Sequence, residues 1–105
     1  MKFLRMTFKT VDEESKKTGE IIANVFDDKA IIKFENQEQT NFTYNALIKS
    51  GKKAIYSRGQ IIQFFTGKKI NEIKEILKED IKNGIKETDK SKRKITITDY
   101  MEEER

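Results

Sequence analysis

The chain of 105 residues suits a single domain, residues 1–105. Because 38% of the residues are charged and only 35% are hydrophobic, we expect a small core that gains burial as a homodimer. Cysteine and histidine are both absent, which excludes disulfides, thiolate or imidazole metal sites and the usual hydrolytic triads, so we expect no enzyme, catalytic residue, metal or cofactor.

The first 40 residues predict an antiparallel β-meander. Alternating apolar and polar residues, and runs of β-branched residues, predict three strands, at 3–11, 20–26 and 30–36. In the first strand Leu4, Met6 and Phe8 share one face. The other two strands are apolar on both faces, which exceeds what a solvated sheet requires. Either the rest of the chain or a second copy should cover the second face, so the meander is also a candidate dimer face.

The middle of the chain predicts two short helices with a strand between them. Tyr44, Leu47 and Ile48 recur at helical spacing, and Ser57 is a suitable N-cap for the second helix. The predicted elements are a polar link at 36–41, a helix at 43–50, a strand at 53–56 and a helix at 58–65.

Residues from 69 onward predict the longest helix, at 69–82. Ile70, Ile73, Leu77 and Ile81 form one apolar face, and the pair at 83–84, Asn-Gly, indicates the end of the helix. The remaining residues predict strands at 85–88 and 94–100 around a basic loop at 89–93, and a frayed tail at 101–105.

Positive charge gathers in two stretches of a chain whose net charge is +4. No acidic residue lies between Glu38 and Glu72, whereas this window holds six Lys and Arg residues. The second stretch is the tip of the predicted hairpin, where lysine and arginine outnumber the two acids. Both stretches favour a polyanionic partner.

The order of the predicted elements over residues 43–100 resembles the winged helix-turn-helix superfamily. Residues 57–76 are similar to its two-helix unit, with Gly67 in the turn and isoleucines at the core positions. The resemblance implies an α+β fold, in which the β-meander of residues 1–40 precedes a winged helix-turn-helix-like unit. It also implies binding to double-stranded DNA.

The second helix of this unit departs from the superfamily pattern. In ordinary members it enters the major groove, but here Glu72, Glu75 and Glu79 would repel phosphate beyond the first turn. The basic hairpin tip, or wing, is better suited to a groove. A basic wing beside an acidic second helix is similar to the arrangement in small dimeric accessory proteins of conjugative plasmids. Those proteins bind origin-of-transfer repeats chiefly through the wing. The resemblance implies a plasmid or mobile-element protein of a relaxosome, with other transfer or replication proteins as further partners.

The expected DNA contacts follow from this arrangement. Arg93 is the expected base reader, because its planar fork can take both acceptors of guanine. If about six phosphates are neutralised, log K should fall with log salt at a slope of about −5. The candidate DNA-binding residues are Lys90, Lys92, Arg93 and Lys94 in the wing, and Ser57, Arg58, Lys68, Lys69 and Asn71 on the flanking phosphates.

A phage or plasmid protein that docks on a host complex, for example as an inhibitor, is the alternative function. In that case the meander would supply the docking surface, and the acidic tail at 102–104 could mimic nucleic acid. No apolar run approaches the roughly 20 residues that span a bilayer. We therefore expect a cytoplasmic protein with no membrane partner.

Overall fold

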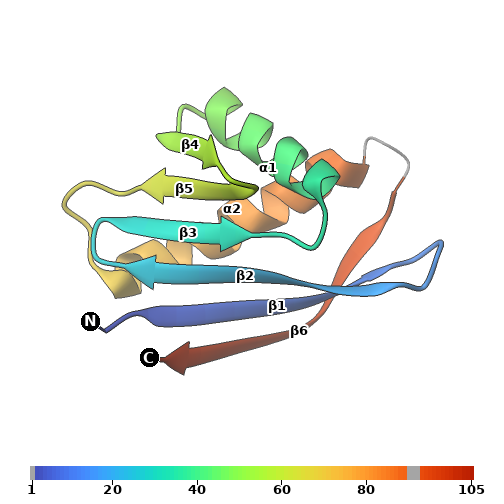
Figure 1. Cartoon of the computed structure of the whole chain (residues 1–105), viewed down its shortest axis with the longest axis horizontal. Helices are drawn as coiled ribbons and strands as arrows, with labels where there is room; N and C mark the ends of the chain where they lie inside the picture. The colour runs from blue at the N-terminus through green and yellow to red at the C-terminus, as the bar shows by residue number, and fades with distance from the viewer. Residues whose placement is uncertain (1, 90–92) are drawn as a thin grey trace.

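The computed structural model describes residues 2–89 and 93–105. Within these residues the chain forms one antiparallel sheet with the strand order β4-β5-β3-β2-β1-β6, and both helices lie on the same face of the sheet (Figure 1). The predicted α+β class is confirmed. The elements are β1 (Leu4–Asp12), β2 (Thr18–Phe26), β3 (Lys29–Lys33), α1 (Gln37–Lys49), β4 (Ala54–Ser57), β5 (Gln60–Phe64), α2 (Ile70–Asp89) and β6 (Ile95–Glu104).

The predicted meander is confirmed as β1, β2 and β3. Leu4, Met6 and Phe8 all point into the core beneath the helices and are at most 7% exposed. Antiparallel pairing places Phe8 opposite Ile21 and Ile32 opposite Ala23, so the buried positions of the three strands share one face. Period-two alternation therefore decides which face of the meander is buried.

Helix α1 begins earlier than the spacing predicts, within the segment expected to be a polar link. Asn36 is its N-cap, and the Asn36 side chain accepts a 2.8 Å hydrogen bond from the backbone N–H of Gln39. The predicted inward face is only partly right, because Leu47 is buried but Ile48 is 46% exposed. The small residue Thr43 is fully buried instead, where α1 packs against α2. Because α1 packs closely against α2, the small side chain of Thr43 faces α2, and Ile48 faces solvent.

The helix predicted at 58–65 is wrong, because these residues form the turn after β4 and strand β5. Arg58 and Gly59 have φ angles of 53° and 77°, and Ser57 pairs with Gln60 across them. A two-residue turn with both φ angles positive matches the right-handed twist of a β-hairpin. Ser57 therefore precedes a hairpin turn and does not cap a helix.

The helix predicted at 69–82 is confirmed but is longer, and this removes the predicted wing. Helix α2 continues through residues 83–84 to Asp89, so the strand predicted at 85–88 is wrong. The apolar face continues with it, since Ile85 follows Ile81 at helical spacing and is 9% exposed. The strand predicted at 94–100 is confirmed as β6, but its partner is β1 at the far edge of the sheet (Figure 1).

The residues expected to be a frayed tail belong to β6 as well. Glu102 pairs with Met6, and Phe3 and Arg105 exchange two backbone hydrogen bonds of 2.9 and 2.8 Å. Since 60–64 is a strand and 85–88 is helical, the described residues do not form the expected two-helix unit or a two-stranded wing. Within the same residues, no helix combines the length and apolar character that crossing a bilayer requires.

Candidate functional site

The candidate DNA-binding residues do not converge on one surface. Lys68 and Lys69 lie in the loop before α2, whereas Arg93 and Lys94 precede β6, and these segments lie at opposite ends of the molecule (Figure 1). Helix α2 has 20 residues and separates them by about 30 Å, at 1.5 Å per residue. Lys90 and Lys92 lie outside the described residues.

Several of the remaining candidates are paired with carboxylates. Lys68 Nζ lies 4.0 Å from Glu72, and Lys69 Nζ lies 3.8 Å from Asp27. Asn71 is exposed in the first turn of α2, while Ser57 and Arg58 lie at the β4–β5 turn. These positions add little to a common positive field, because neighbouring carboxylates neutralise the two lysines.

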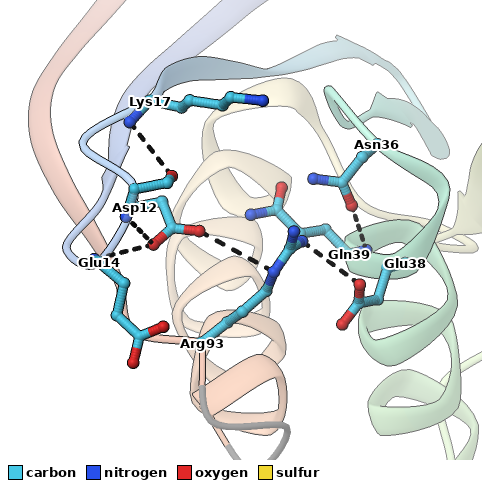
Figure 2. A network of polar contacts seen from close by, with 8 residues as sticks. Asp12, Glu14, Lys17, Asn36, Glu38, Gln39 and Arg93 are labelled. Atoms are coloured by element: carbon cyan, nitrogen blue, oxygen red, sulfur yellow. Dashed lines mark hydrogen bonds and ion pairs between the residues drawn. The ribbon is translucent and has the colours of Figure 1, made fainter.

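Arg93, the expected base reader, bridges two carboxylates from different elements. Its guanidinium lies between Asp12, at the end of β1, and Glu38, in the first turn of α1 (Figure 2). The nitrogen–oxygen distances are 3.9 and 3.3 Å. A backbone hydrogen bond from Ser15 is the main cause that holds the pKa of Asp12 below its usual value, and the charge of Arg93 acts in the same direction. The carboxylate is therefore ionised at neutral pH, and Arg93 serves as a tie between elements.

A polar cleft of about 450 Å³ adjoins this ion-pair bridge. Its walls come from the β1–β2 turn and the start of α1, and the side chains of Gln39 and Arg93 lie beside one another there (Figure 2). Three carboxylates and two cations line it, so it has no positive excess that would hold a phosphate chain. The described residues contain no cluster of side chains suited to a metal ion.

The acid-free window of the sequence corresponds to a continuous part of the structure. Residues 39–71 include most of α1 and all of β4 and β5, and these two strands lie at the edge of the sheet opposite β6 (Figure 1). Strand β6 has the reverse character, with four acids and no cation among its ten residues. Charge is therefore segregated across the sheet, with a basic edge at β4 and an acidic edge at β6.

The face of the sheet away from the helices, here named the open face, carries an unusual share of apolar side chains. Among the described residues no helix covers it (Figure 1). Ile31 of β3 lies in register with Ile62 of β5, which in turn lies in register with Ile55 of β4. Ile55 is 47% exposed, and none of the three belongs to the core. The expectation that the chain itself covers this second face is therefore not met.

A row of aromatic and cationic residues crosses the open face next to these isoleucines. Lys29 pairs with Phe26 on one side and with Phe64 on the other, and the backbone of Phe64 bonds to that of Lys53. The Phe26 ring lies 5.1 Å from that of Phe3, between ring centroids. We name these residues the aromatic–cation row; in order from β6 to β4 they are Arg105, Phe3, Phe26, Lys29, Phe64 and Lys53.

The cations at the β4 side of the row are available to a ligand. Among the described residues, no carboxylate lies within ion-pair distance of Lys29 or Lys53, whereas Arg105 is bound by Glu103 at 3.2 Å. Lys29 lies over the ring of Phe26, with its Nζ 5.8 Å from the centroid. Phe64 is 41% exposed. Strands β3, β5 and β4 contain no acidic residue; the nearest carboxylates in the chain, Asp27 and Asp28 of the β2–β3 turn, are held by Lys69 and by the backbone N–H of Gly67.

Two members of this row, Lys53 and Phe64, lie in the acid-free window of the sequence, but the helical spacing of residues 58–65 predicts a helix at Phe64. The sequence carries a partial signal, since Phe26 and Lys29 flank a two-residue turn and must pair if the hairpin forms. The pairing of β3 with β5 joins residues 29 to 35 positions apart, and no local pattern indicates it.

No protein-family model matches the chain, and the searches of curated proteins and of solved structures find no match either.

Proposed function

We propose that this protein binds nucleic acid through the aromatic–cation row on the open face of the sheet. The observation that carries the proposal is the position of Phe64, an exposed ring held between Lys29 and Lys53, neither of which has a carboxylate within ion-pair distance among the described residues. Nucleic-acid surfaces commonly combine cations that neutralise phosphates with aromatic faces that accept bases. The expected origin-of-transfer role required a two-stranded basic wing, which the described residues do not form. We therefore propose nucleic-acid binding alone.

The spacing of the cations supports this function. Neighbouring strands lie about 4.8 Å apart, which places the backbones of Lys29 and Lys53 about 10 Å from each other on either side of β5. Lys33 lies on the same face as Lys29, four residues along β3. Lys29 and Lys53 therefore flank Phe64, and Lys33 adds a third cation about 13 Å further along β3. Flexible lysine stems allow each to reach a phosphate.

A charge-reversal experiment tests the proposal. The double variant Lys29→Glu with Lys53→Glu should weaken binding to a labelled oligonucleotide at least tenfold at about 50 mM salt. The matched control, here called the Lys82 variant, is Lys82→Glu with Lys86→Glu, which makes the same charge change at two exposed positions of α2 outside the row. For the unaltered protein, about three neutralised phosphates of a single strand give a slope of about −2 in log K against log salt.

Two results would reject nucleic-acid binding at this surface. The first is the absence of salt-sensitive binding by the unaltered protein. The second is an equal loss for the row variant and the Lys82 variant, which would mean that only net charge matters. Circular dichroism of each variant checks that the fold is retained.

Protein docking through the same face is the second candidate function, and the isoleucines favour it. Ile31, Ile55 and Ile62 form an apolar strip beside the row that a solvated sheet does not need. Lysines are depleted from the centres of protein interfaces, however, and here Lys29, Lys33 and Lys53 border the strip. Ile62→Ser distinguishes the two functions, because it should abolish docking of a protein while it leaves the salt slope for nucleic acid unchanged.

A further inference from the structure

We infer that the nucleic acid bound by the aromatic–cation row is single-stranded. This inference rests on the proposed function and names its ligand class. The sequence alone led us to expect double-stranded DNA, through residues that the structure places at opposite ends of the molecule. The aromatic–cation row is a different surface, and we expect it to prefer a single strand to a duplex.

The width of the surface excludes reading of a duplex in its groove. The row crosses every strand from β6 to β4, and five strand spacings of about 4.8 Å make it about 24 Å long. The major groove of B-DNA is about 12 Å wide and admits a helix or a two-stranded ribbon. A broad sheet cannot enter it, so Phe64 and its neighbours cannot reach the base edges of a duplex.

Stacking on the exposed ring requires a base with a free face. In a duplex both faces of each base are covered by neighbouring bases, whereas in an unpaired strand a base can turn onto an aromatic side chain. Phe64 is the primary platform, since it is 41% exposed. Phe26 is half-buried and already contacts Phe3 and Lys29, so it offers a smaller second position.

The cations on either side of Phe64 fit the repeat of a single strand. An ammonium group lies on each side of Phe64, from Lys29 and Lys53, so phosphates on both sides of a stacked base find a cation. Beyond Phe26 the row ends at Arg105, which Glu103 already holds. The strand should therefore bind mainly over β2, β3, β5 and β4, at the lower end of known site sizes, about four nucleotides.

A tryptophan variant gives the most direct test, because the chain contains no tryptophan. Phe64→Trp makes the new indole the only one, and its fluorescence should be quenched when an unpaired oligonucleotide of about 15 nucleotides is added. The duplex of the same sequence should cause little quenching. Met101→Trp is the matched control, since Met101 is 43% exposed on β6, faces the same side and lies outside the row.

Affinity measurements complete the test. Phe64→Ala should weaken binding of the unpaired oligonucleotide by about five- to a hundredfold and change binding of the duplex little. Met101→Ala should bind like the unaltered protein. The oligonucleotide is used in both DNA and RNA form, and tighter binding of either unpaired form than of its duplex supports the inference.

The outcomes separate this inference from the function on which it rests. If the Lys29 and Lys53 variant loses binding but the duplex binds as tightly as the single strand and Phe64→Ala is neutral, nucleic-acid binding stands and the single-strand inference is wrong. If the unaltered protein binds neither form in a salt-sensitive way, the proposed function itself is wrong.

Discussion

The side-chain amide of Gln63 donates a 2.9 Å hydrogen bond to the carboxylate of Asp80, and this bond joins β5 to α2 in the interior. Both residues are at most 7% exposed, and Lys52 lies 3.8 Å from the other oxygen of Asp80. A polar bridge in this position explains how a glutamine can occupy the buried face of a strand.

Gln63→Leu should lower the free energy of unfolding by about 2 kcal/mol, because it leaves the carboxylate of Asp80 buried with a single distant partner. The double variant Gln63→Leu with Asp80→Leu should recover most of this loss, since a buried polar pair can be replaced by apolar packing. Urea unfolding followed by circular dichroism measures both. Equal losses in the single and double variants would argue against the bridge.

Gly84→Ala should destabilise the protein by about 1–2 kcal/mol, although alanine is the better helix former. A Cβ atom at Gly84 would lie 2.7 Å from Cγ2 of Thr43, where α1 and α2 pack together. Adding Thr43→Ala to Gly84→Ala should restore only part of the stability, because it removes Cγ2 but leaves the Cβ atom of residue 43 at 2.9 Å from the new one. Asn83→Ala, at the exposed neighbour, is the control and should leave the thermal midpoint unchanged or slightly raised.

Arg93→Ala should cost no more than about 1 kcal/mol of stability, because the bridge to Asp12 and Glu38 is partly exposed and screened by salt. The Arg93→Ala protein should bind nucleic acid with the same affinity as the unaltered protein, measured in the titration that also tests the Lys29 and Lys53 variant. A selective loss of binding in Arg93→Ala would indicate that the binding surface lies at the Arg93 end of the molecule.

Glu102 should make stability depend on pH in the acid range. Partial burial raises the pKa of Glu102, but hydrogen bonds from Tyr100 and Lys74 outweigh this effect, so its pKa lies below the ordinary value of 4.5. A group with a lowered folded-state pKa stabilises the fold above its unfolded pKa, and this contribution is lost as pH falls through the folded pKa.

The free energy of unfolding should therefore decrease as pH falls below about 4.5. Glu102→Gln should lower stability at neutral pH by about 1 kcal/mol or less, since the side chain is 29% exposed, and should flatten the decrease in acid. Urea unfolding at a series of pH values measures the slope. An unchanged slope in Glu102→Gln would assign the acid sensitivity to other carboxylates such as Asp12.

Local patterns predicted the parts of the fold that depend on neighbouring residues. The alternation of Leu4, Met6 and Phe8 identified the buried face of β1, and the spacing of Ile73, Leu77 and Ile81 identified that of α2. The same reasoning failed at 60–64, where Ile61 and Phe65 also fit helical spacing. A buried glutamine between them disguised the alternation of a strand.

The amino-acid sequence by itself determined the α+β class, the meander, the inner face of α2 and the acid-free stretch that becomes the basic edge. Only the tertiary structure decided that β6 returns to β1 and that β5 pairs with β3, because such pairings join distant residues and leave no periodic signal. Those two pairings bring the members of the aromatic–cation row together from both ends and the middle of the chain. Register between strands, rather than any motif, creates the surface.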